Sequence, residues 1–132
     1  MIRNYKDLIF WQRSFEVTRL VIELCRKLPK ERIAEILVSQ IIRSSVSIGA
    51  NIAEGFGRYK SKEYPRFLQV ALGSANETEY WLIIIKDTYS AFNKEIDLIL
   101  EKNLETIKML STSLKTLKNN KDLSLKSFSL NS

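Results

Sequence analysis

Apolar residues recur at helical spacing along most of the chain, and they predict four helices. The first helix ends at Leu28-Pro29, because the residue before a proline avoids the helical conformation. The predicted helices span about residues 6–27, 30–56, 62–89 and 94–118. Their connections are short, which is typical of an antiparallel up-down-up-down four-helix bundle. We therefore expect an all-α domain over residues 1–118.

The second predicted helix contains Gly49 and Gly55, either of which could interrupt it. At about 100° per residue, its polar positions nevertheless fall within an arc of about 80°, and its apolar positions cover about 180° on the far side. This separation continues through Gly49, and a break there would have disturbed it. The pattern therefore predicts one helix in which Gly49 is a close-packing position.

Polar positions form one stripe on the second helix and another on the third, and the two sets of spacings mirror each other. The stripes are Gln40, Arg43, Ser47, Asn51 and Glu54, and Arg66, Gln69, Gly73, Glu77 and Tyr80. Positions whose numbers sum to 120 lie level on antiparallel helices joined by this turn, since both rise about 1.5 Å per residue. The expected pairs are Glu54 with Arg66, Asn51 with Gln69, Ser47 with Gly73, Arg43 with Glu77, and Gln40 with Tyr80.

Three interpretations of these stripes are open. The preferred one is a structural polar seam that fixes the register of two helices or joins two subunits, because polar networks commonly specify geometry in bundles. In the second interpretation, the stripes form a binding site in which guanidinium and amide groups contact a phosphate or carboxylate. Its residues are Arg43, Asn51, Arg58 and Arg66. In the third, Glu54 and Glu77 perform acid–base chemistry.

The fourth predicted helix carries a heptad seam, and the chain after it does not. Ile96, Asn103, Leu110 and Leu117 recur every seven residues, with Asn103 as the polar exception. No helical stripe continues through residues 119–132, which we interpret as a mobile C-terminal tail.

The composition excludes several classes of function. Among 132 residues there is no histidine and a single cysteine, which removes His-based triads, His-ligated metals and clustered cysteine ligands. No glycine-rich phosphate loop occurs. We therefore expect no enzymatic activity, no metal and no cofactor. The apolar run 81–85 is too short to span a membrane, and the first residues do not resemble a signal peptide, so we expect a cytoplasmic protein.

The chain is basic, with 21 Lys and Arg against 15 Asp and Glu and a net charge of +6. Such a surplus favours binding to RNA or DNA through the phosphate backbone, although it also suits a solvated surface. One candidate surface is the turn between the second and third helices, with two tyrosines for stacking: Arg58, Tyr59, Lys60, Lys62, Tyr64 and Arg66. The second is the end of the fourth helix and the tail: Lys108, Lys115, Lys118, Lys121 and Lys126.

Apolar residues exceed what one bundle can bury. The second helix has an apolar arc of about 180°, wider than the ~100° that faces a core, and residues 81–85 are apolar on every side. Such surplus predicts self-association, with residues 81–85 and part of the first helix as candidate contacts. An alternative is an oligomeric adaptor that docks a protein partner such as a polymerase or reverse transcriptase.

Four segments resemble a known family, the 23S rRNA intervening-sequence proteins, also called four-helix bundle proteins. They are residues 5–12, Leu28-Pro29, 37–58 and 66–79, and the resemblance covers about residues 4–115. The family pattern more often has proline where Gly49 stands here. The resemblance implies an antiparallel bundle, a ring-shaped homopentamer and no enzymatic activity. Members are encoded within large-subunit rRNA genes, and a related group, the accessory variability determinants of diversity-generating retroelements, works with a reverse transcriptase and RNA.

Overall fold

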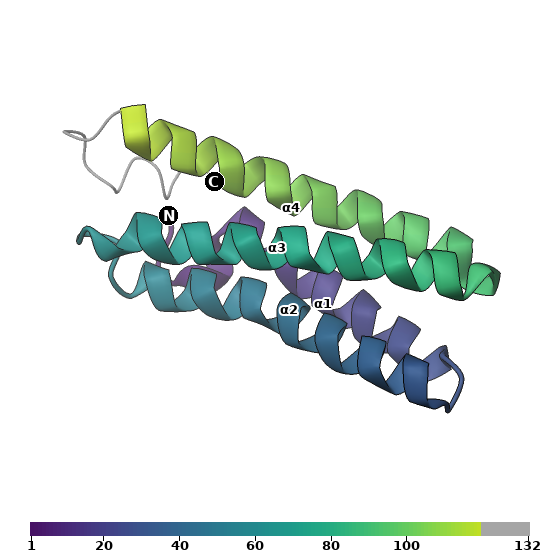
Figure 1. Ribbon diagram of the computed structural model, residues 1–132. Coiled ribbons are helices and arrows are strands. Elements are labelled where there is room, and N and C mark those ends of the chain that lie inside the picture. Colours follow the sequence, from purple (N-terminus) through teal and green to yellow (C-terminus); the bar gives the residue numbers. More distant parts are fainter. Residues whose placement is uncertain (120–132) are drawn as a thin grey trace.

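The computed structural model describes residues 1–119 and consists of four long helices (Figure 1). They are α1 (Ile9–Lys27), α2 (Arg32–Phe56), α3 (Glu63–Thr88) and α4 (Asn93–Asn119). Two 3-10 turns, η1 (Tyr5–Asp7) and η2 (Ser90–Phe92), precede α1 and α4. The predicted all-α four-helix bundle is confirmed. The predicted tail lies outside the described residues after Asn119.

Each helix contacts the helices next to it in the chain, and α1 also contacts α4, so the four form a closed arrangement. Ion pairs show the direction of α4 relative to α1. Lys102 of α4 pairs with Glu16 at 3.8 Å, while Glu95, earlier in α4, pairs with Lys27, later in α1, at 3.1 Å. The partner number falls as the α1 number rises, so these two helices are antiparallel.

The first helix begins at Ile9, three residues later than expected, because a separate turn comes before it. Asn4 and Asp7 form a reciprocal capping box around η1. The Asn4 side chain accepts from the backbone N–H of Asp7, and the Asp7 side chain accepts from the backbone N–H of Asn4. Leu8 then takes an extended conformation with φ −75° and ψ 128° and is fully buried. The capped turn therefore anchors the N-terminal segment to the bundle before α1 starts.

The core consists of two apolar clusters. One surrounds Phe10, Ile52 and Leu110 at the end that holds the N-terminus and the α2–α3 turn, and the other surrounds Leu24 and Ile99 at the opposite end. Between the clusters every helix contributes a buried polar side chain. We call this set the polar layer: Ser14, Ser44, Ser45, Thr78, Asn103 and Thr106. Two contacts of this set join different helices, Ser44 with Thr78 and Asn103 with the carbonyl of Ala75, while the other hydroxyls bond to carbonyls of their own helices.

Helix α2 continues through Gly49, as predicted, and its two internal glycines mark close approaches to other helices. A Cβ atom at Gly49 would lie 3.1 Å from the hydroxyl oxygen of Ser14. A Cβ atom at Gly55 would lie 2.7 Å from the Cβ atom of Phe67, which is too close for real atoms. Helices α2 and α3 thus touch near their turn only because residue 55 has no side chain.

The two glycines Gly55 and Gly73 predict opposite responses to alanine. Gly55→Ala forces α2 and α3 apart and should lower the free energy of unfolding by ~1–3 kcal/mol. Gly73 lies in α3 with no atom within 4 Å of an added Cβ. Gly73→Ala should therefore raise the free energy of unfolding by ~0.5–1 kcal/mol, since alanine favours a helix interior. Urea unfolding followed by circular dichroism measures both, and equal effects of the two variants would contradict the close approach at Gly55.

Candidate nucleic-acid interface

The polar layer divides the bundle into two halves of very different charge. Residues 1–13, 46–77 and 107–119, which we call the basic half, hold ten Lys and Arg against four Asp and Glu. Residues 15–43 and 79–102, the neutral half, hold nine of each sign. The excess positive charge of the described chain therefore lies at the end of the bundle that carries the N-terminus, the α2–α3 turn and the last turns of α4 (Figure 1).

The α2–α3 turn holds the first predicted surface. Arg58 forms an ion pair with Glu54 one turn earlier, and its guanidinium lies 5.2 Å from the ring centre of Phe67. Tyr59 stacks on Phe56 with ring centres 5.4 Å apart, so one of its faces is already covered. Lys60 and Lys62 are exposed and make no ion pair with any carboxylate in residues 1–119. The turn thus offers lysine charges rather than a free aromatic platform.

The prediction that Tyr64 stacks on bases is wrong. Its side chain is 1% exposed and belongs to the apolar cluster of the basic half, beside Leu68 and Ile52. The residue lies on the inner side of the first turn of α3, where the aromatic ring fills the end of the core. The charged residues on either side of this tyrosine hide the helical period, so the sequence alone places it on the surface.

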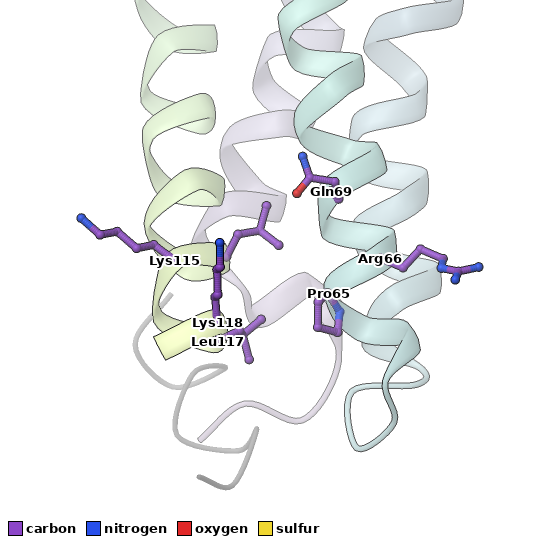
Figure 2. Close-up of a pocket in the computed structure, with 7 residues that line it drawn as sticks. Pro65, Arg66, Gln69, Lys115, Leu117 and Lys118 are labelled. Carbon is purple, nitrogen blue, oxygen red and sulfur yellow. The ribbon is translucent and has the colours of Figure 1, made fainter. Parts of the chain in front are cut away.

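The structure brings parts of the two predicted basic surfaces together. Arg66 of α3 and Lys115 and Lys118 of α4 border a groove of about 620 Å³. We call it the α3–α4 groove, and its lining is Pro65, Arg66, Gln69, Leu114, Lys115, Leu117 and Lys118 (Figure 2). Lys121, also predicted to take part, lies outside the described residues.

The sequence reasoning did not identify the apolar part of this groove. Leu117 of the heptad seam faces the core as expected and is only 6% exposed, while Leu114 is half-buried and also lines the groove. The side-chain amide nitrogen of Asn103 donates to the carbonyl of Ala75 at 2.9 Å, which sets α4 against α3. In this alignment Leu114 and Leu117 lie level with the first turn of α3, where the seam reaches the end of its partner helix.

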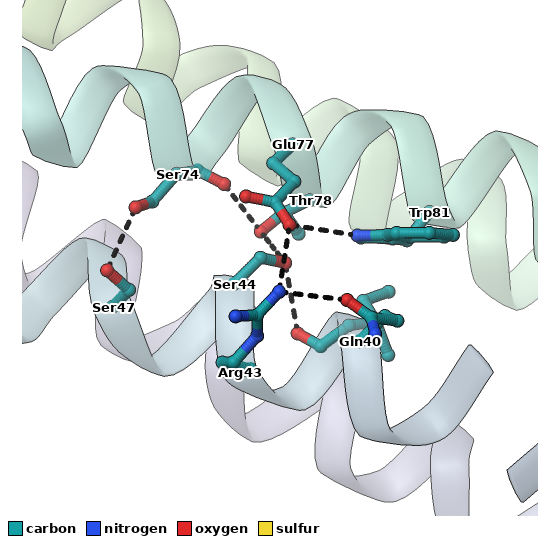
Figure 3. A network of polar contacts seen from close by, with 9 residues as sticks. Gln40, Arg43, Ser44, Ser47, Ser74, Glu77, Thr78 and Trp81 are labelled. Carbon is teal, nitrogen blue, oxygen red and sulfur yellow. Dashed lines mark hydrogen bonds and ion pairs between the residues drawn. The ribbon is translucent and has the colours of Figure 1, made fainter. Parts of the chain in front are cut away.

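The polar seam between α2 and α3 exists, but its register differs slightly from the prediction. Arg43 lies 3.9 Å from Glu77, as expected. The hydroxyl of Ser47 accepts from Ser74 at 2.9 Å rather than facing Gly73 (Figure 3). The hydroxyls of the buried pair Ser44 and Thr78 lie 2.8 Å apart, a contact that the exposed stripes did not reveal. These hydroxyl contacts shift the pairing by one or two residues from a sum of 120.

The other expected cross-helix pairs are replaced by contacts within each helix. Glu54 pairs with Arg58, and Arg66 lies 3.9 Å from Glu63, so the predicted Glu54–Arg66 pair does not form among the described residues. Ion pairs between residues three or four apart on one helix form in preference to pairs across two helices, because both partners are already held on the same helix surface. Two further stripe residues also bond locally. Gln40 accepts from Arg43 rather than meeting Tyr80, and the amide of Asn51 donates to Ser47 rather than to Gln69.

These local contacts bear on the other two interpretations of the stripes. The four residues expected to share an anion each have a separate partner, so in this structure they form no common site: Arg43, Asn51, Arg58 and Arg66. Glu54 and Glu77, the candidate acid–base pair, are also each engaged with an arginine. Both carboxylates lie on the surface, with side chains 54% and 44% exposed.

Three groups of the described chain have clearly shifted pKa values, and each shift has a structural cause. Backbone amides of the N-terminal segment donate to Asp7 and lower the pKa of that carboxyl. Burial raises the pKa of the Cys25 thiol to about 11, which keeps it protonated and unreactive. The hydrogen bond from the Tyr89 hydroxyl to Glu31 raises the pKa of Tyr89 to about 12. Residues 1–119 contain no cluster of three acidic, cysteine or histidine side chains that could hold a metal ion.

Together these features define an all-α four-helix-bundle protein with one basic end. The chain belongs to the 23S rRNA-intervening sequence protein family, whose model matches residues 6–112. A solved structure with the same fold is that of a protein of unknown function from the S23 ribosomal protein family of Bacteroides thetaiotaomicron. The two chains share 31% identity and a TM-score of 0.73, over 81% of this chain and 99% of that one. No curated protein matches the chain.

The seam predicts a specific pattern of mutational coupling between Ser44 and Thr78. Thr78→Val keeps the side-chain shape but removes the cross-helix partner of the buried Ser44 hydroxyl, which keeps its bond to the carbonyl of Ile41, and should lower the free energy of unfolding by ~0.5–1.5 kcal/mol. Ser44→Ala should have a smaller effect. The double variant should cost less than the sum, because neither hydroxyl then lacks its partner. Strict additivity in urea unfolding would show that this contact does not couple the two helices.

Proposed function

We propose that this protein is a non-enzymatic homo-oligomer that binds RNA or DNA through the phosphate backbone with its basic half. The observation that carries the proposal is the charge asymmetry, ten cations against four anions in the basic half and nine of each in the neutral half. A polyanion gains from such a surface by releasing condensed counterions. The family description supports the proposal, since it refers to 23S rRNA, a polyanion of the cytoplasm.

The proposed binding is directed to phosphates and depends weakly on sequence. Among residues 1–119, the cations of the basic half that form no ion pair are Arg3 and six lysines, and a lysine ammonium acts as a point charge rather than as a planar fork that reads a base. Arg58 and Arg66, which could read guanine, lie beside acidic neighbours in the same helical segment. Contacts of this kind position a protein on nucleic acid without choosing a sequence.

Exposed apolar side chains support self-association. Phe15 on α1 is 57% exposed, Val46 on α2 is 45% exposed and Ile83 on α3 is 51% exposed. Within the expected contact 81–85, Leu82 and Ile85 are buried while Ile83 points outward. Helix α2 is also apolar and long enough to cross a membrane by length and composition, a property shared by core helices of bundles. We propose that copies of the chain cover these side chains, in the five-subunit ring that the family resemblance implies.

Replacing two lysines should separate phosphate binding from the fold. In Lys60→Gln/Lys118→Gln two of the six lysines of the basic half become neutral, and the salt slope of RNA retention should fall by about 2 in log–log terms. The matched control is Lys30→Gln/Lys94→Gln, which makes the same change in the neutral half and should leave retention unchanged. Filter binding at a series of salt concentrations gives both slopes. Equal losses in the two variants, or no wild-type binding at about 50 mM salt, would contradict the proposal.

Self-association predicts a solution mass near five times 15.3 kDa. Light scattering coupled to size exclusion measures it at tens of micromolar protein. Ile83→Ser should lower the mass because it removes an exposed apolar side chain from the proposed contact, while Ser39→Ala, an exposed change on α2, should not. A mass of 15.3 kDa for the wild type would overturn the oligomer. A wild-type oligomer that retains no nucleic acid would instead favour the adaptor alternative, in which the ring docks a protein such as a polymerase.

A further inference from the structure

We infer that the α3–α4 groove holds an unpaired segment of nucleic acid, so that the protein prefers single strands to duplexes. The inference rests on the proposed function, and it assigns that function a specific substrate form. Its basis is the contrast within one small groove between an apolar floor and a cationic border. The floor is made by Pro65, Leu114 and Leu117, and the border includes Lys115 and Lys118.

The side chains of the groove divide into two groups (Figure 2). Lys118 and Gln69 stand beside the space between α3 and α4, close to the apolar floor. Lys115 and Arg66 extend outward on opposite sides of it. A strand that crosses the groove thus meets lysine charges on the α4 side, the Arg66 guanidinium, 3.9 Å from Glu63, on the α3 side, and apolar surface between them. The groove is open to solvent, and its volume of about 620 Å³ leaves room for a flat nucleobase to lie on the floor.

Charge alone gives the opposite preference. Duplex DNA carries one negative charge per about 1.7 Å of its axis, a higher density than one strand has, and a purely electrostatic surface therefore favours the duplex. An apolar floor favours the single strand, because an unpaired base can lay its flat face on apolar atoms, whereas the base faces of a duplex are already stacked on one another. The α2–α3 turn also has a hollow, of about 680 Å³ and lined by Tyr59, but one face of Tyr59 is stacked on Phe56 and Tyr64 is buried, so the turn lacks the leucine and proline floor of the groove.

The chemistry of the groove also limits what it recognises. Its apolar atoms contact any base face, so the base identity matters little. The Gln69 amide can donate and accept at a base edge, which adds a modest preference without a fixed code. The groove therefore accepts unpaired RNA and unpaired DNA, and a comparison of both with a duplex distinguishes groove binding from charge binding.

Fluorescence anisotropy tests the inference with three labelled probes of equal length and sequence: an unstructured RNA strand, the corresponding DNA strand and the DNA duplex. The wild-type chain should bind both single strands about fivefold more tightly than the duplex at about 200 mM salt. Leu114→Asn should remove this preference, because it makes the floor polar and leaves every charge in place. Leu114→Met should retain it, since methionine keeps the floor apolar.

Leu104→Asn is the matched control, a change of the same kind on α4 at a leucine that is 42% exposed and lies outside the groove. It should keep the preference, and circular dichroism and size exclusion confirm that each variant keeps its fold and assembly. A duplex bound as tightly as the single strands, or a preference unchanged by Leu114→Asn, overturns the groove assignment while phosphate binding stands. Failure to bind any probe overturns the proposed function itself.

Discussion

The polar layer at the middle of the bundle is the constraint on which the rest of the structure depends. Apolar contacts between helices tolerate small displacements, but a buried hydroxyl or amide must meet its partner within hydrogen-bond distance. The contact between Ser44 and Thr78 fixes α2 against α3, and the bond from Asn103 to Ala75 fixes α4 against α3. These bonds are few, and together they align three of the four helices.

Both candidate surfaces follow from this alignment. Counting outward from the Ser44–Thr78 contact brings Gly55 against Phe67, so the chain must reverse within the short turn that gathers Lys60 and Lys62. Counting outward from Asn103 brings the last turns of α4 level with the first turn of α3, where the groove forms. Residues far apart in the sequence therefore share one end of the bundle because of bonds formed about four turns away.

Sequence reasoning succeeded where one helix determines the outcome. The helical period predicted the four elements and the continuity of α2 through Gly49, because each face of a helix repeats along its own sequence. It also placed Arg43 opposite Glu77, since two antiparallel helices rise equally from a common turn. It failed for Glu54 and Arg66, where partners on the same helix compete successfully. It also missed the groove, because the placement of α4 on α3 is set by contacts between the helices, among them the bond of Asn103 to Ala75 and the Lys86–Asp97 pair, that the period of one helix does not encode.

Charge and self-association reinforce each other if the copies form a closed ring. Rotation about the ring axis preserves the component of each bundle's direction along that axis. Unless the bundles lie perpendicular to the axis, every basic half then emerges on the same face of the ring. The charge surplus of one chain is modest, but its repetition on one face gives a single strand several sites within reach, and each bound site raises the effective concentration at the next. If the proposed ring forms and the groove binds as proposed, a weak groove on one subunit contributes to tight binding by the assembly, and the surplus apolar faces and the uneven charge then serve one function.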